Sequence, residues 1–139
     1  MMMDDCLFCR IAKGEIPCSK VYEDDNFLAF LDINPVNKGH TLVIPKEHYE
    51  TFTDLPDEKV NDFMAIVRKV MAGIKTSLNP DGFNIFNNNK PAAGQEVPHL
   101  HFHVLPRYEG DGNTFKWEND KYAEGEMAEV TEKIRNNLE

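Results

Sequence analysis

The stretch from residue 99 to residue 103 places a histidine at every second position, and this alternation constrains the fold more than any other feature of the sequence. The three histidines are His99, His101 and His103. Side chains of a β-strand point alternately to opposite faces, so the three imidazoles are predicted to share one face. The opposite face then turns toward a hydrophobic core and carries Leu100, Phe102 and Val104. Because three adjacent imidazoles give up hydrophobic burial and repel one another when protonated, the row indicates a functional surface.

Hydrophobic periodicity predicts the other elements. Apolar residues recur at 3.6-residue spacing over residues 56–78, which predicts one long helix. Runs of β-branched and aromatic residues predict strands over residues 21–22, 27–31, 41–44, 83–86 and 100–105. A short helix is expected over residues 6–13, and a C-terminal helix is indicated by the apolar stripe Ala123, Met127, Val130, Ile134 and Leu138. One long helix among hairpin-like strands is typical of an α+β domain with a mainly antiparallel sheet.

Size and charge restrict the class of protein. The chain has 139 residues, which suits a single domain, and its formal net charge is −9. The missing basic surface argues against binding to nucleic acids or to membrane surfaces. No apolar run approaches the roughly 18 residues of a membrane span, and the acidic N-terminus does not resemble a signal peptide. We therefore expect a cytoplasmic protein, with much of its acidity in residues 109–139, where nine acidic residues outnumber four basic ones.

Two chemistries fit the histidine row. A metal ion could take two or three of the imidazoles, or one imidazole could be a nucleophile that its neighbours orient. The row alone does not separate these alternatives. Nearby polar residues suit phosphate and sugar groups, namely Asn88, Gly94, Gln95 and Asp32. An apolar wall for a flat base could come from Leu7, Phe8 and Ile11. Together these residues favour a nucleotide site over a purely metal-binding one.

Cys6 and Cys9 form a C-x-x-C pair. In a reducing compartment this spacing indicates a metal or redox site before it indicates a disulfide. A redox pair of this kind opens a helix after a strand in a βαβ unit, and no such unit is predicted here. Metal binding is therefore the favoured interpretation.

Several ordered motifs together resemble the histidine triad (HIT) family, in the bacterial branch related to the histidine triad nucleotide-binding proteins. The motifs are residues 99–105 (HLHFHVL), 6–9 (CLFC) with 14–17 (GEIP), 29–33 (AFLDI), 39–46 (GHTLVIPK) and 94–98 (GQEVP). The resemblance covers residues 4–107 and leaves 108–139 as an acidic C-terminal extension of a single domain, 1–139. It implies a HIT-like fold, with a five-stranded antiparallel sheet and one long helix, and a homodimer.

The resemblance also implies a function. Family members transfer a nucleotidyl group to water through a nucleotidyl-histidine intermediate, so the chain is expected to cleave nucleoside phosphoramidates, aminoacyl adenylates or dinucleoside polyphosphates, with a purine base favoured. His101 would be the nucleophile, His103 would contact the α-phosphate and the leaving group, and His40 would support the site. The other positions carried over would hold phosphate, ribose or base, and they are Asn88, Gly94, Gln95, Glu96, Val97, Asp32, Leu7, Phe8, Ile11 and Ile33.

Glu96 departs from some relatives, which have a serine at this position. A carboxylate beside a phosphate would repel it, so we expect Glu96 to turn its side chain away and to offer only its backbone N–H.

Galactose-1-phosphate uridylyltransferase, a distant relative, holds a structural zinc ion with a C-x-x-C pair and two histidines. The matching positions imply one zinc ion per chain, held by Cys6, Cys9, His48 and His99. Whether His99 then serves the zinc ion, the active site or both stays open. Two rival functions also remain: a nucleotide-binding or partner-regulating protein with little turnover, and a metalloenzyme with a catalytic zinc ion in the triad.

Overall fold

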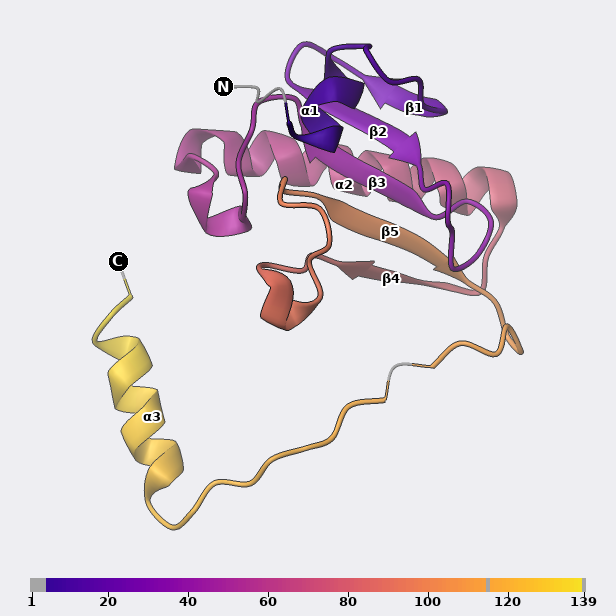
Figure 1. Cartoon of the computed structure of the whole chain (residues 1–139). Coiled ribbons are helices and arrows are strands. Elements are labelled where there is room, and N and C mark those ends of the chain that lie inside the picture. Colours follow the sequence, from indigo (N-terminus) through magenta and orange to yellow (C-terminus); the bar gives the residue numbers. More distant parts are fainter. Residues whose placement is uncertain (1–4, 115, 139) are drawn as a thin grey trace.

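A computed structural model describes residues 5–114 and 116–138. The predicted first residue of the core, Asp4, and the predicted last residue of the domain, residue 139, lie outside these ranges. Five strands form one antiparallel sheet, as predicted, and their order in the sheet is β1-β2-β3-β5-β4 (Figure 1). The strands are β1 (Lys20–Glu23), β2 (Phe27–Leu31), β3 (Thr41–Pro45), β4 (Gly82–Phe86) and β5 (Phe102–Arg107). The helices are α1 (Leu7–Ala12), α2 (Asp57–Leu78) and α3 (Glu126–Arg135), with 3-10 turns η1 (Phe52–Asp54) and η2 (Pro91–Ala93).

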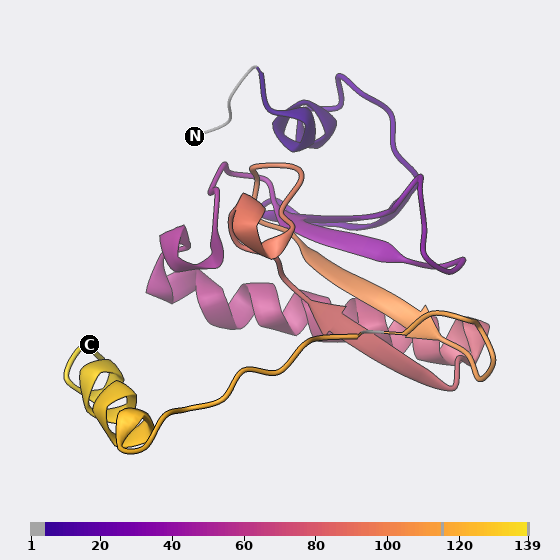
Figure 2. The same cartoon turned by 60° about the horizontal axis from the view of Figure 1, so that its bottom comes forward.

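Each face of the sheet has its own core. The long helix α2 covers one face, and α1 covers the other (Figure 2). Along β2, Phe27 and Ala29 pack in the α2 core, whereas Leu28 and Phe30 pack in the α1 core. Because both faces of the central strands are buried, these strands read as continuous apolar runs rather than as alternating ones.

The boundaries of several elements differ from the prediction. The fifth strand runs two residues later than predicted, because the N–H groups of His99 and Leu100 donate to the carbonyl oxygens of Val97 and Tyr49 rather than to a neighbouring strand. Asp54, predicted near the start of the long helix, instead closes a capping box with Thr51 in η1. The first helix is also shorter than predicted, since Cys6 is its N-cap.

The C-terminal segment leaves the sheet after β5 and runs along the outside of β4 to α3, which lies apart from the other elements (Figures 1 and 2). The apolar stripe there does form a helix, as predicted, but the helix is shorter than the stripe. No helix in residues 5–114 and 116–138 combines the length and the hydrophobicity that crossing a bilayer requires.

Gly39 precedes β3 and has φ +96°, a backbone conformation that residues with a Cβ rarely adopt. A Cβ atom there would lie 2.5 Å from Leu78 Cδ1 at the end of α2. Gly39→Ala should therefore lower the free energy of unfolding by about 1–2 kcal/mol, mainly through the backbone conformation. Chemical denaturation measures the change.

Gly73 provides the matched control. It lies in α2, and a Cβ there would meet no atom within 4 Å. Gly73→Ala should raise the free energy of unfolding by about 0.5–1 kcal/mol. Equal effects of the two substitutions would contradict the argument.

Candidate active site and metal cluster

The three histidines of the row lie on the α1 face of the sheet, as predicted, while Leu100 and Val104 lie in the α2 core. The imidazoles of His101 and His103 are neighbours, with ring centroids 5.0 Å apart. Phe8 of α1 packs edge-on against His101, at 5.1 Å and 89°. The row therefore sits between the sheet and the first helix.

The hydrogen bonds of His101 fix its tautomer. Its Nδ1 lies 2.7 Å from the carbonyl oxygen of His99, and a carbonyl oxygen can only accept, so Nδ1 carries the proton. In the neutral ring, Nε2 then keeps an unprotonated lone pair. The carbonyl of His101 itself accepts from Asn87 Nδ2 at 2.9 Å, which holds this part of the backbone in place. His101 thus has the form that a nitrogen nucleophile requires.

A chain of hydrogen bonds gives His103 the opposite tautomer. The backbone N–H of Val36 donates to His40 Nδ1 at 3.2 Å, so the proton of neutral His40 is on Nε2. His40 Nε2 lies 2.9 Å from His103 Nδ1 and donates to it. His103 therefore carries its own proton on Nε2 and can donate it to a substrate oxygen.

Phe86 is a site neighbour that the sequence did not indicate. It pairs with His103 across β4 and β5, and its ring stacks on the imidazole at a centroid distance of 4.3 Å and an interplanar angle of 9°. In the sequence, Phe86 resembles any core aromatic residue, and only the strand register places it here. The stacking fixes the plane of the His103 ring.

Burial keeps the site histidines neutral. It lowers the pKa of His103 to about 4, with smaller contributions from His101 and His40. Burial also lowers the pKa of His101 and of His40, against the opposing effects of the His99 carbonyl and of the Asp32 carboxylate respectively. At pH 7 the neutral tautomers described above are therefore the populated ones.

A cluster of two cysteines and two histidines joins α1 to the histidine row. The four predicted metal ligands, Cys6, Cys9, His48 and His99, bring their ligand atoms within 4.8 Å of one another. His99 Nδ1 lies 3.3 Å from Cys6 Sγ and 3.4 Å from Cys9 Sγ, and His48 Nδ1 lies 3.4 Å from Cys9 Sγ. Tetrahedral zinc with ordinary bond lengths separates sulfur and nitrogen ligands by about 3.6 Å. The donor set and its spacing fit a closed zinc site.

The tautomer of His99 also fits a metal ligand. Its Nε2 lies 2.8 Å from the carbonyl oxygen of Pro45 and must donate to it, which leaves the Nδ1 lone pair pointing at the two cysteines. Such a hydrogen bond on the far nitrogen is the usual support of a ligating histidine. Because His99 Nδ1 faces sulfur, this ring is directed away from the chemistry of His101.

In the loop before the row, several groups that the sequence predicted to bind phosphate form hydrogen bonds with the protein instead. The Gln95 side chain is buried, accepts from the Lys90 N–H at 2.7 Å and donates to the Glu50 carbonyl at 2.8 Å. Asn88 Nδ2 lies 3.5 Å from the Gly94 carbonyl. The N–H groups of Gly94 and Gln95 also donate within the loop. In this structure both polar groups of the Gln95 side chain therefore bond to the backbone of the protein.

The two backbone N–H groups that follow Gln95 remain available as donors. Among the residues that the structure describes, the N–H groups of Glu96 and Val97 have no hydrogen-bond acceptor. Glu96 is exposed, and Val97 packs beside the α1 core.

The predicted ribose and base contacts lie around the same face. Asp32 Oδ1 accepts from the Asn34 N–H at 2.9 Å and so caps the turn, while Oδ2 lies 3.9 Å from His40 Nε2. Phe8 is buried, and Ile11 packs beside it in the α1 core. Leu7 is exposed, and Ile33 is 90% exposed.

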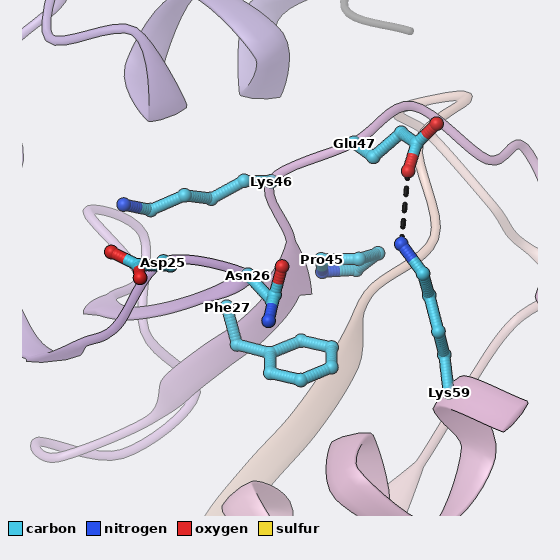
Figure 3. A pocket seen from close by; sticks show the side chains of 7 residues that line it. All are labelled: Asp25, Asn26, Phe27, Pro45, Lys46, Glu47 and Lys59. Atoms are coloured by element: carbon cyan, nitrogen blue, oxygen red, sulfur yellow. Dashed lines mark hydrogen bonds and ion pairs between the residues drawn. The ribbon is translucent and has the colours of Figure 1, made fainter.

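A separate pocket of about 290 Å³ lies at the end of β3 and contains none of the predicted site residues (Figure 3). Its two lysines are both engaged in ion pairs. Lys46 Nζ lies 2.8 Å from Glu23, and Lys59 Nζ lies 3.0 Å from Glu47. With its cations already paired, this pocket is a poor anion site.

Comparison with known proteins matches the sequence profile of the HIT domain to residues 13–110. A HIT-like protein of Methanocaldococcus jannaschii is 52% identical over 130 residues, covering 94% of this chain and 98% of its own. Adenosine 5'-monophosphoramidase hnt1 of Schizosaccharomyces pombe is 47% identical over 73% of this chain and 74% of its own length. Adenylylsulfatase HINT3 of Arabidopsis thaliana is 44% identical over 79% of this chain and 56% of its own length.

Solved structures agree with the fold. A HIT family member from Bacillus subtilis has a TM-score of 0.90 at 42% identity, over 98% of this chain and 99% of its own. A zinc-bound histidine triad family protein from Mycobacterium smegmatis has a TM-score of 0.75 at 44% identity, over 84% of each chain.

The low pKa of His103 makes stability depend on pH. Between pH 6.5 and about 4, an unfolded chain binds a proton at this ring that the folded chain excludes, so stability falls as the pH drops through this window. From pH 7 to pH 5, His103 should contribute a loss of about 1 kcal/mol, after allowance for its partial exposure. Calorimetry should show a smaller fall in melting temperature for His103→Gln than for the wild type. An equal fall would contradict this role.

Proposed function

Because the chain belongs to the histidine triad (HIT) family, we propose that it is a nucleotide-binding hydrolase that releases a nucleoside monophosphate. Its substrates are nucleoside phosphoramidates, aminoacyl adenylates or dinucleoside polyphosphates. The observation that carries the proposal is the pair of opposite tautomers: His101 presents a lone pair at Nε2, and His103 presents an N–H. A nucleophile beside a donor is the arrangement that phosphoryl transfer requires.

In the first step, the lone pair of His101 Nε2 forms a bond to the α-phosphorus. The bond from phosphorus to the leaving group breaks, and the leaving group departs with the bonding electrons and takes a proton from water. In the second step, the oxygen of a water molecule bonds to phosphorus, and the Nε2–phosphorus electron pair returns to His101. That water releases a proton to the solvent, where it neutralises the hydroxide left by the first step. Because the His99 carbonyl accepts from Nδ1 throughout, it stabilises the positive charge that develops on the ring.

Hydrogen-bond donors stabilise the negative charge on the phosphoryl oxygens. His103 Nε2–H and the backbone N–H groups of Glu96 and Val97 fill this role, and the Glu96 carboxylate turns toward solvent. Preorganised donors of this kind act without reorganisation during the reaction. The His40–His103 hydrogen bond keeps the donor aimed.

The nucleoside part binds along the first helix and the turn after β2. Asp32 Oδ2 accepts from ribose hydroxyls while Oδ1 caps the turn, and Leu7, Phe8, Ile11 and Ile33 line the base. The relatives from fission yeast and Arabidopsis bear names that denote adenine nucleotides, which favours a purine base.

Two rival functions are less well supported. A protein that only binds nucleotides would not need the unprotonated Nε2 of His101 beside a donor. A catalytic zinc ion in the triad would need several of its imidazoles to converge on one point. Within the described residues, no potential metal cluster contains more than one histidine of the row.

A structural zinc ion completes the proposal, held by Cys6, Cys9, His48 and His99. When bound, it supplies a cross-link between α1 and the residues before β5, and takes no part in the chemistry at phosphorus. The fit of the donor atoms and the zinc-bound relative from M. smegmatis support it. Cysteines that bind zinc must be reduced, which suits a cytoplasmic protein.

The proposed activity can be tested by a turnover screen of adenosine phosphoramidate and diadenosine polyphosphates, with and without a chelator. The wild type should release AMP. His101→Asn should reduce turnover by at least about 1,000-fold, because it removes the nucleophile, and should leave AMP affinity within about tenfold. His103→Ala, which removes the Nε2–H donor, should lose less.

Residual activity decides the assignment. If His101→Asn keeps a tenth of the wild-type rate, the nucleophile is another group. If the wild type binds AMP and turns over none of the substrates, the binding function is correct.

Freshly purified protein should contain about one zinc ion per chain by elemental analysis. Cys6→Ser should lose the metal and lower the melting temperature, because a closed zinc site contributes to folding. The matched control is Cys18→Ser, which removes a thiol outside the cluster and should keep the zinc. Metal-free wild-type protein would refute the zinc proposal without touching the proposed role of His101.

A further inference from the structure

The long helix α2 leaves an apolar groove open beside the edge strand β1. The helix packs mainly on β5, β3 and β2, and β1 lies at the edge of the sheet (Figure 1). The groove has a volume of about 540 Å³, within the range of about 300–1,000 Å³ that is usual for small-molecule sites. Its apolar walls include Val21 of β1, Leu31 of β2 and Leu78 of α2, and all three side chains are exposed.

A glycine in the middle of α2 gives the groove its depth. Glycine inside a helix is destabilising relative to alanine, and contact with a close neighbour is the usual reason for it. A Cβ atom on Gly73 would meet no atom within 4 Å, so no packing contact with the described residues requires this glycine. Lys69, Gly73 and Ser77 follow one another at four-residue spacing and line the groove from one side of the helix. The absent side chain therefore leaves free volume rather than a contact.

The hydroxyl groups that line the groove are already bonded to the protein. Tyr22 donates to Asp24 at 2.8 Å. Thr41 and Ser77 donate to the carbonyl oxygens of Gly39 and Gly73, each at 2.8 Å. A ligand would therefore meet mainly hydrocarbon and aromatic surface along the walls.

The charge at the rim is positive. Among the described residues that line the groove, Lys38 and Lys69 are charged and none is acidic, although the chain has a formal net charge of −9. Neither lysine forms an ion pair with a carboxylate of the described residues. The ammonium group of Lys69 lies 5.0 Å from the centroid of the Tyr22 ring, which keeps this charge at the groove.

The sequence of α2 explains why Lys69 has no partner on its own helix. The residues one turn away are all uncharged, and they are Ala65, Ile66, Ala72 and Gly73. By contrast, both lysines of the pocket at the end of β3 are paired with glutamates. An anionic group of a ligand would therefore meet a lysine that is not already neutralised.

We propose that the groove binds a medium-chain fatty acid, with its hydrocarbon chain between α2 and β1 and its carboxylate at the rim lysines. The nine residues from Lys69 to Leu78 span about 13 Å of helix, which gives the groove the elongated shape that one unbranched chain fills. A bilayer surface suits it less, because anionic lipids repel a chain of net charge −9. The groove lies on the face of the sheet opposite the histidines, so this site is independent of the hydrolase activity proposed above.

Isothermal titration calorimetry of the full-length chain tests the proposal, with decanoate as the probe. One decanoate should bind per chain, and octanoate, which is two methylene groups shorter, should bind about tenfold more weakly because less hydrocarbon is buried. Gly73→Leu fills the groove and should reduce the decanoate affinity at least about tenfold. The matched control is Ala72→Leu, which adds the same side chain at an exposed position of α2 outside the groove and should leave binding unchanged.

The head group is tested with the charge variants. Lys38→Gln combined with Lys69→Gln should weaken decanoate binding about three- to tenfold, and should leave the binding of uncharged 1-decanol unchanged. Lys75→Gln is the control, because Lys75 is an exposed lysine of α2 outside the groove. Circular dichroism verifies that every variant keeps its fold.

Four results would overturn the proposal. The first is the absence of saturable decanoate binding, and the second is an affinity that Gly73→Leu leaves unchanged. The third is a lower sedimentation mass of Gly73→Leu, which would mean that a second copy of the chain covers the groove. The fourth is cosedimentation of the wild type with phosphatidylglycerol vesicles that Gly73→Leu abolishes, which would assign the groove to a bilayer.

Discussion

The hydrogen bond from His99 Nε2 to the carbonyl oxygen of Pro45 ties together the parts of this molecule that matter for its chemistry. It joins the end of β3 to the residues before β5 and turns Nδ1 toward Cys6 and Cys9. Cys6 is the N-cap of α1 and Cys9 lies within this helix, so the position of the helix depends on the orientation of one imidazole ring. Phe8, which lies between the two cysteines in the chain, then packs against His101. Metal cluster and nucleophile are thus connected through one turn of helix.

The same principle sets every tautomer in the site. Three backbone groups, the carbonyls of His99 and Pro45 and the N–H of Val36, decide where the protons of His101, His99 and His40 lie. Backbone groups cannot change their donor or acceptor character, so these assignments persist as long as the loops keep their shape. Burial adds to this by keeping the rings neutral. The backbone around the row therefore determines its chemistry as much as the histidines themselves do, because it sets which ring nitrogens carry protons.

Much of this could be predicted from the sequence, and the limits have physical causes. The alternation of residues 99–104 and the periodicity of α2 gave the sheet face and the long helix, because side-chain direction follows directly from strand and helix geometry. The predicted start of β5 was two residues too early. The sequence does not distinguish a backbone N–H that bonds to a distant loop from one that bonds to a neighbouring strand. The role of Gln95 could not be predicted, because a side-chain amide can hydrogen-bond a ligand or the backbone of its own loop. Phe86 depended on strand register, which no local pattern reveals.

The row runs into β5, and its side chains alternate between the two faces of the sheet, which has a consequence for how this segment can change. Inserting or deleting one residue between His99 and Val104 would turn every later side chain through half a turn. Imidazoles would then enter the apolar core beneath α2, and bulky hydrocarbon groups would fill the reactive surface. A single substitution here affects one face of the sheet, whereas an insertion or deletion disrupts both the hydrophobic core and the reactive surface. The number of residues in this segment should accordingly be under a stronger constraint than the identity of any apolar residue within it.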